Sequence, residues 1–327
     1  MGITRLSTLK PYRFESVEIG EELGPVEGVV SELKVKQHAF AVDDYGPWYF
    51  HRSPFGGRIG HPTLLATDVL MMITLAYDVV TPPCEAGLHA RNELEFLKPV
   101  FINQKVIIRG THVEKYKKRA QSYRVLDGTV EDEGGQALVR MRATETIGLT
   151  PATPVGQGMS APPPDAISGD IPAGAPTVHH ATRWVPEGAA LPTLVKRTTL
   201  EQSTAYSGYP FGWVEGGGTS MWVNQHTDPE LARQHGHSDA VIQGLCSAAY
   251  ISEMCVNFYG PSWLTTGKLL TTFLRPVVVR DMITVGGVVK RYEEQDGGTR
   301  RRLRLDVWCK NQRGELATVG RASAVVE

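Results

Sequence analysis

Two stretches of the chain are apolar on nearly every side and predict central helices with little contact to solvent. The first runs from Pro62 to about Val79. The second starts at Gly244 and continues to about residue 258 without a helix-breaking residue. A helix that is apolar almost all round needs cover on more than one side, so we expect a sheet to wrap each of them.

Segments with strand-like composition follow each of these helices. They are rich in Val, Ile, Thr and Arg, and glycine-containing turns such as Glu133-Gly134-Gly135 and Arg313-Gly314 separate some of them. A further strand is predicted at 28–35, before the first helix, and 196–206 is expected to lead into a loop. The predicted strands that follow the helices are 88–96, 105–116, 120–130, 137–147, 282–292, 299–309 and 316–326.

The two halves of the chain repeat the same order of elements. The clearest match is Phe-Leu-Lys-Pro-Val at 96–100 against Phe-Leu-Arg-Pro-Val at 273–277. Between the halves, a stretch dense in Pro, Gly and Ala has no periodicity and is typical of a linker or a surface strap. The sequence therefore predicts an α+β protein with one unit at 1–150, a linker at 151–194 and a second unit at 195–327.

The composition excludes several classes of protein. The chain has 327 residues, 41% of them hydrophobic and 21% charged, and a formal net charge of -1, so it lacks the basic excess expected of a nucleic-acid-binding protein. No apolar run reaches the roughly 18 residues of a membrane helix, and no signal peptide is evident. We expect a cytoplasmic, reduced protein without metal, membrane or nucleic-acid partners. Its scattered cysteines fit no metal or disulfide pattern: Cys84, Cys246, Cys255 and Cys309.

A histidine lies in the loop before the second central helix. His226 is followed by Asp228-Pro229-Glu230, which is typical of a helix N-cap, a proline at the first helical position and an acidic first turn. Capping explains Asp228 more readily than catalysis does. An imidazole near the open N-terminus of a buried helix can move a proton while helix N–H groups hold a carbonyl oxygen. The alternative for His226 is a polar histidine on the surface.

The order of loop, buried helix, Phe-Leu-(Lys/Arg)-Pro-Val and three long strands resembles the hotdog fold of the MaoC-like hydratase and dehydratase family, present twice. The helix start Ile-Ala-His-Gly of that family is matched by Val241-Ile242-Gln243-Gly244 and by Ile59-Gly60-His61-Pro62. The resemblance implies a tandem, or double, hotdog. It also implies reversible hydration of 2-enoyl thioesters to 3-hydroxyacyl thioesters without a cofactor.

The first copy departs from the catalytic loop of the family, which resembles Asp-x-Asn-Pro-x-His. Asp44 keeps the first position, but Tyr49 stands in place of the histidine, and His51 lies two residues beyond it. Pro62 replaces the glycine at the helix start and has no N–H to hold an oxyanion. The resemblance therefore implies a degenerate, substrate-binding half. For Asp44 and His51, the alternative is a packed, hydrogen-bonded loop.

The second copy keeps His226, Asp228 and Gly244, but Met221 stands five residues before His226, where the pattern has Asp. The carboxylate that partners His226 stays open among Glu215, Asp44 and Asp228. The candidate catalytic residues are His226, Asp228, Asp44 and His51. The candidate substrate-binding residues are Asn224, Gln243, Gly244, Tyr49 and Trp213.

These residues predict a lyase that acts on 2-enoyl or 3-hydroxyacyl thioesters by general acid–base catalysis, with coenzyme A favoured as the carrier over acyl carrier protein. Two other functions stay open. One is a thioesterase of the hotdog type, and the other is a subunit that binds acyl thioesters without catalysis. We also expect the chain to form a homodimer.

Overall fold

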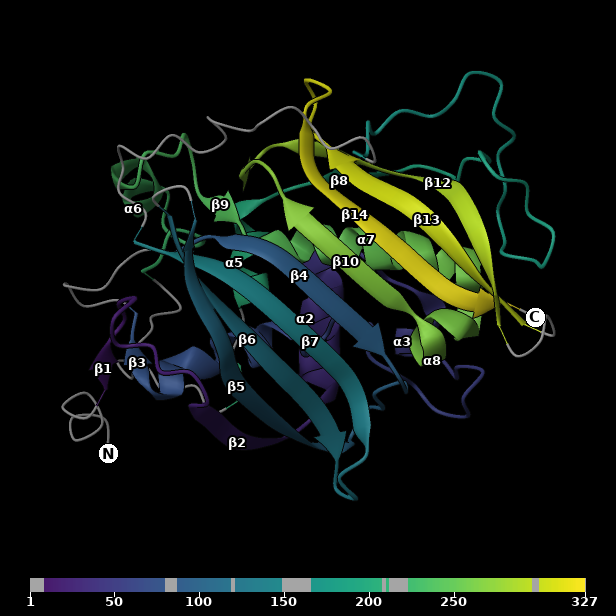
Figure 1. Ribbon diagram of the computed structural model, residues 1–327. Helices are drawn as coiled ribbons and strands as arrows, with labels where there is room; N and C mark the ends of the chain where they lie inside the picture. Colours follow the sequence, from purple (N-terminus) through teal and green to yellow (C-terminus); the bar gives the residue numbers. More distant parts are fainter. Residues whose placement is uncertain are drawn as a thin grey trace.

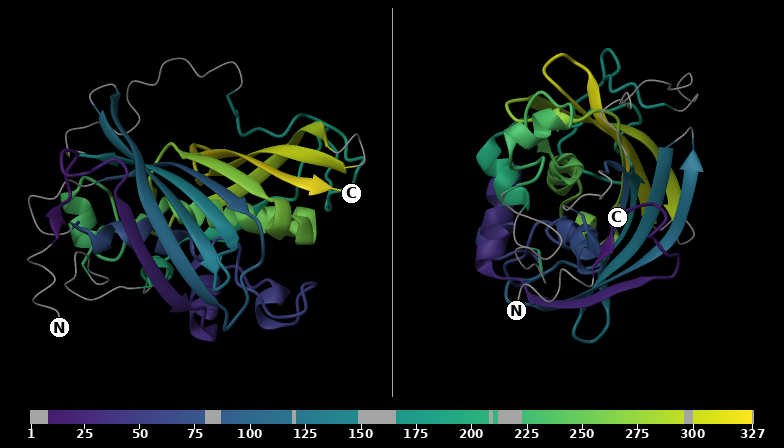
Figure 2. Two further views of the ribbon diagram at one scale, coloured as in Figure 1. Left: turned by 60° about the horizontal axis from the view of Figure 1, so that its bottom comes forward. Right: turned by 90° about the vertical axis from the view of Figure 1, so that its left-hand side faces the viewer.

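The computed structural model describes residues 9–79, 87–118, 121–148, 166–207, 210–211, 223–295 and 300–326. Its centre is one antiparallel sheet of ten strands, ordered β2-β5-β6-β7-β4-β10-β14-β13-β12-β8. The long helix α7 lies along one face of this sheet, and the other helices gather on the same side (Figures 1 and 2). The first five strands of the order come from the first half of the chain and the last five from the second half.

The strands of the first half are β2 (Glu22–Val29), β4 (His89–Phe96), β5 (Lys105–Lys118), β6 (Gln121–Asp132) and β7 (Ala137–Ile147). Those of the second half are β8 (Leu194–Arg197), β10 (Lys268–Phe273), β12 (Met282–Gln295), β13 (Arg300–Lys310) and β14 (Leu316–Val326). All seven strands predicted after the helices are present, with ends that differ by up to three residues. Short pairs complete the β structure: β1 (Lys10–Pro11) with β3 (Tyr77–Asp78), and β9 (Val241–Ile242) with β11 (Val277–Val278).

The two halves meet where β4 pairs with β10. Leu94 faces Leu269 at this junction. The repeated motif makes the same backbone bonds in both copies: Leu97 N donates to Leu138 O, and Leu274 N donates to Ala317 O. The two like halves expected from the repeat, and the double hotdog that the resemblance implies, are therefore confirmed.

The second central helix is confirmed as α7 (Gly244–Tyr259), and its side chains are mostly buried. The first is shorter than predicted. Instead of 62–79, it comprises α4 (Ala66–Leu70) and the 3-10 helix η1 (Met71–Leu75). The Thr74 hydroxyl donates to Met71 O within η1, and the chain then leaves the helix because residues 77–78 pair with 10–11. The remaining short helices are α3 (Pro47–Phe50), α6 (Pro229–Gln234), η2 (Gly260–Ser262) and α8 (Trp263–Thr266).

The prediction of a strand at 28–35 is wrong. β2 ends at Val29, and α2 (Glu32–Val42) begins two residues after Val30 because the Ser31 side chain caps it by accepting from Lys34 N. In the second half, the segment expected to enter a loop instead forms β8 and α5 (Leu200–Ser207). Helices α2 and α5 pack together, and Gln37 Nε2 in α2 donates to Ala205 O in α5 at 3.0 Å.

The described part of the predicted strap before β8 is 166–193. This segment contains no helix and no extended strand. It follows the edge of the second half, where Leu191 N donates to Gly287 O and Val289 N donates to Ala189 O. The buried Ala189, Ala190 and Leu191 fix this part of the segment against β12. Residues 151–165 of the predicted linker lie outside the described residues.

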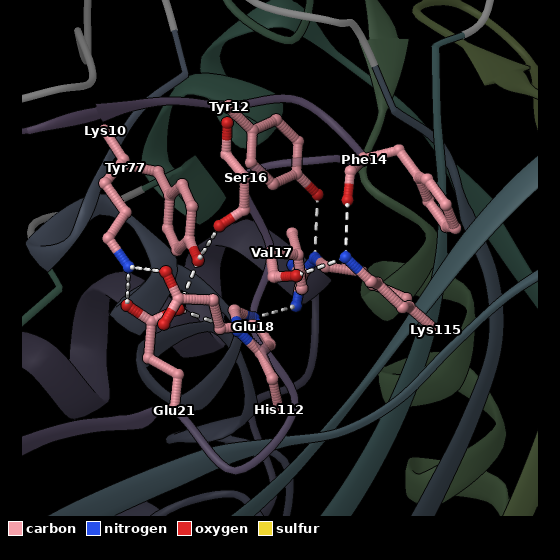
Figure 3. Close-up of polar contacts among 11 residues, drawn as sticks. Lys10, Tyr12, Phe14, Ser16, Val17, Glu18, Glu21, Tyr77, His112 and Lys115 are labelled. Carbon is pink, nitrogen blue, oxygen red and sulfur yellow. Dashed lines mark hydrogen bonds and ion pairs between the residues drawn. The ribbon is translucent and has the colours of Figure 1, made fainter.

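A network of buried polar side chains joins the N-terminal segment to the first half of the sheet (Figure 3). Arg124 is fully buried, donates to Tyr12 Oη at 2.7 Å and pairs with Glu145. His112 lies between Arg124 and Glu21, 3.4 Å and 3.5 Å from their side chains. Burial, aided by the charge of Arg124, lowers the pKa of His112 to about 4. The network holds this end of the sheet through charge and hydrogen bonds.

Replacing Arg124 with Met should lower the free energy of unfolding by about 3 kcal/mol, because the change leaves Glu145 without its cation and Tyr12 Oη without its donor. Urea unfolding followed by circular dichroism measures this difference. Arg140→Met is the matched control, since Arg140 pairs with Glu95 on the exposed face and should change stability by less than about 1 kcal/mol. Equal losses in the two variants would contradict the role given to Arg124.

Candidate active site

His226 is held in one orientation by its loop and by β9. Its backbone N–H donates to Asn224 Oδ1 at 2.8 Å, and its carbonyl accepts from Ser203 Oγ at 2.7 Å. The ring atom Nδ1 lies 2.7 Å from Val241 O. Because a carbonyl can only accept, Nδ1 carries the proton and Nε2 is left with a free lone pair. Burial lowers the pKa of His226 to about 4, so the ring is neutral near pH 7.

The N-terminus of α7 lies three residues beyond the carbonyl that holds His226. Within the described part of the chain, the side chain of the N-cap residue Gln243 does not cap this helix, and its amide donates instead to Ser207 Oγ at 3.2 Å. Gly244 is the first helical residue, and a Cβ there would lie 3.1 Å from the Phe273 ring. This end of α7 therefore keeps first-turn N–H groups that can bind a carbonyl oxygen as negative charge develops on it.

Matching backbone bonds align the two loops. Val241 N donates to Gln225 O at 2.9 Å, and Ile59 N donates to Trp48 O at 3.0 Å. Since Gln225 precedes His226 and Trp48 precedes Tyr49, Tyr49 occupies the position of His226. By the same alignment, Pro62 in the first half is equivalent to Gly244 in the second half.

In the first half, Tyr49 and Asp44 form a closed, buried pair. Tyr49 Oη donates to Asp44 Oδ2, and Gly46 N donates to Asp44 Oδ1, each at 2.9 Å. His61 Nε2 lies 3.5 Å from Asp44 Oδ2. Burial raises the pKa of Asp44, while these hydrogen bonds oppose the shift. Asp44 is thus committed to its own loop, through both carboxylate oxygens.

Two charged residues that the sequence analysis did not select lie beside this pair. Lys196 Nζ in β8 is 2.6 Å from Glu253 Oε2 in α7, and both side chains are largely buried. Burial, together with the charge of Asp44, raises the pKa of Glu253 to about 7. The signal in the sequence was that Glu253 is the only charged residue in α7. This buried group joins the first-half loop to the second half.

The other candidate catalytic residues lie away from these contacts. Asp228 Oδ1 accepts from Glu230 N at 2.8 Å and from Leu231 N at 3.3 Å, which confirms that Asp228 caps α6. His51 is exposed at the end of α3. Neither side chain has a described contact with His226. Trp213 and Glu215 lie outside the described residues.

A cavity of about 170 Å³ lies between α2 and α5, next to the N-terminus of α7. Ser207 lines it and also accepts the bond from Gln243. His38 and Tyr206 line its buried side, with their rings 5.6 Å apart. No group of three potential metal-ligating His, Cys, Asp or Glu residues occurs in the part of the chain that the structure describes. In that part, no helix is long and apolar enough to cross a membrane.

Comparisons with known proteins relate the chain to others by structure alone. No family model matches the sequence, and no curated protein matches it. A solved structure described as a MaoC-like dehydratase aligns with a TM-score of 0.71 at 17% identity, covering 96% of this chain and all of the other.

Two further structures agree with this result. A putative MaoC domain dehydratase from Chloroflexus aurantiacus aligns with a TM-score of 0.64 at 9% identity, covering 98% of each chain. A conserved hypothetical protein of Mycobacterium tuberculosis, described as a double hotdog, aligns with a TM-score of 0.61 at 14% identity over 96% of this chain and 98% of the other. The chain therefore has the double hotdog fold that these proteins share.

Proposed function

We propose that the chain is a hydratase or dehydratase of the MaoC-like kind, acting on 2-enoyl and 3-hydroxyacyl thioesters. One observation carries this proposal: Nδ1 of His226 is bonded to Val241 O, which leaves Nε2 free as a base next to the uncapped N-terminus of α7. A base and an oxyanion site are the two elements that this reaction needs. The names of the structural neighbours, MaoC-like dehydratases, support the same class.

In the proposed hydration, His226 Nε2 takes a proton from water as the water oxygen bonds to the β-carbon of the enoyl group. The electron pair of the double bond moves toward the thioester, and the N–H groups at Gly244 and Leu245 hold the resulting enolate oxygen. The protonated Nε2 then gives its proton to the α-carbon. Water is added across the double bond, and His226 returns to its neutral form.

One imidazole can serve as both base and acid because the same proton moves in two successive steps, from water to Nε2 and then from Nε2 to the α-carbon. This removes the need for a separate carboxylate at His226. In the described structure Asp228 caps α6, and Asp44 is bonded to Tyr49 and Gly46. We therefore assign Asp44, Tyr49 and Pro62 to an inactive first-half loop that supports the site.

Coenzyme A is the proposed carrier. The cavity between α2 and α5 gives the thioester a route to the N-terminus of α7, since Ser207 both lines it and binds Gln243. Lys34 at this cavity pairs with the buried Asp68, 2.9 Å away, and its ammonium lies over the Phe211 ring. The polar wall suits a pantetheine arm, which carries amide groups.

Incubation with crotonyl-CoA tests the proposal. We expect loss of the enoyl absorbance without release of free thiol. His226→Ala should lower turnover by roughly 100-fold or more, because it removes the base. His51→Ala is the control and should keep full activity, since His51 is exposed and has no described contact with His226. Release of free thiol would indicate a thioesterase instead, and full activity in His226→Ala with loss in His51→Ala would move the site to the first half.

Gly244→Pro should lower the turnover number by roughly 100-fold while leaving the helix in place, because it removes one oxyanion donor. Proline is favoured at the first helical position, and Gln243, with ψ of 137°, has the extended conformation that a residue before proline needs. Pro62→Gly at the equivalent position should change turnover little. Circular dichroism checks the fold of both proteins, and equal effects of the two changes would argue against a single working half.

The pH dependence should report the shifted pKa of His226. A general base must be neutral, and burial lowers the pKa of His226 from 6.5 to about 4. The value of kcat/KM should therefore stay level as pH falls from about 8 to about 5, and decline only near pH 4. Initial rates across this range, with circular dichroism at each pH, measure the profile. A decline centred at pH 6.5 would mean that the essential histidine is not His226.

A further inference from the structure

A polar pair lies at the centre of the junction between the halves. Asn92 in β4 faces Thr271 in β10, and both are fully buried on the side of the sheet that the helices cover. Thr271 Oγ1 donates weakly to Asn92 O at 3.5 Å. No partner with hydrogen-bond geometry reaches either amide atom of the Asn92 side chain among the described residues, but the His89 ring lies near enough for Asn92 to oppose the fall in the His89 pKa.

An unpaired buried amide costs roughly 1–3 kcal/mol, so such a group needs a reason to be there. The fold itself does not require it. By the repeat that aligns Phe96 with Phe273, Asn92 corresponds to Leu269, which is buried and faces Leu94 across the same junction. The two halves thus use an apolar residue and a polar residue at equivalent positions.

Along the junction, the polar pair lies toward the N-terminus of α7. Thr271 is two residues from Phe273, about 7 Å along the strand, and the Phe273 ring packs against Gly244. The His89 ring lies 4.9 Å from the Phe273 ring, and its buried Nε2 has no partner among the described residues. In the other direction, Leu94 and Leu269 lead toward Phe96, the counterpart of Phe273 in the first half, where Pro62 stands at the position of Gly244.

We propose that Asn92 and His89 form a subsite that binds a neutral hydrogen-bonding substituent, a hydroxyl or carbonyl group, on the acyl chain of the substrate. This inference rests on the proposed function, since it places the thioester at Gly244. Asn92 is fully buried, whereas Gly244 at the N-terminus of α7 is only partly buried. The acyl end is the part of the substrate that extends inward, because the carrier arm must lead outward to solvent.

The surroundings of the subsite favour a neutral group over a carboxylate. Burial lowers the pKa of His89 to about 3, and the charge of Arg124 adds to the shift, so His89 is uncharged near pH 7. Arg124 itself is paired with Glu145 and bonded to Tyr12. Asn92 carries both a donor and an acceptor, which matches a hydroxyl group.

Asn92→Leu tests the subsite, because Leu269 shows that leucine fits the equivalent position. Binding of hex-2-enoyl-CoA and of 6-hydroxyhex-2-enoyl-CoA is measured by calorimetry on His226→Ala protein, with and without Asn92→Leu. We expect the hydroxylated thioester to bind more tightly than the plain one, and Asn92→Leu to weaken only the hydroxylated one, by about 10-fold. Leu269→Met is the control and should leave this preference unchanged.

Thermal unfolding without ligand gives a second measurement. If the amide serves a ligand, Asn92→Leu should melt at the same temperature as the parent protein or higher. A lower melting temperature with no change in preference would make Asn92 a structural residue and overturn the inference. If both thioesters bind the parent protein equally, only the subsite fails. If neither binds, the proposed function fails and the subsite with it.

Discussion

The pairing of β4 with β10 is the interaction on which the rest of the structure depends. It joins two five-stranded sheets into one, so that α7 and the shorter α4 pack against the same face of a single sheet. Since successive side chains of a strand point to opposite faces, the register of this pair decides which residues meet under the sheet. The register puts Leu94 against Leu269 and Asn92 against Thr271, and it brings Phe273 to Gly244. If one of the two strands slipped by one residue, its inward-facing side chains would turn to the outer face.

Duplication gives the chain two copies of one loop, and small changes make them chemically different. In the second half, the Val241 carbonyl sets the tautomer of His226, and the N-terminus of α7 is open. In the first half, a tyrosine takes the place of the histidine and binds Asp44, and Pro62 lacks the N–H. Among the described residues, the proposed base and the proposed oxyanion site therefore occur together only in the second half. The proposed activity rests on that asymmetry.

Buried charges also tie the two halves together. Lys196 and Glu253 belong to the second half, while Asp44 belongs to the first, and the charges of Asp44 and Lys196 act in opposite directions on the raised pKa of Glu253. Such a group contributes little net stability compared with apolar packing, because its charges lose their hydration. The group instead holds its members in place, since removing one of them would leave the charges of the others unbalanced. The loop of Asp44 is therefore fixed relative to α7.

The repeat, the strands that follow each helix, the extent of α7 and the cap at Asp228 could all be predicted from the sequence alone. These features depend on local periodicity and on neighbouring residues. The sequence did not determine α2, where the Ser31 cap outweighs a strand-like composition, or the early end of the first central helix, where residues 77–78 pair with 10–11. Only the tertiary structure brought Lys196 to Glu253, Asn92 to Thr271 and His226 to Val241. Cross-strand register and packing place residues far apart in the chain, and no local pattern contains that information.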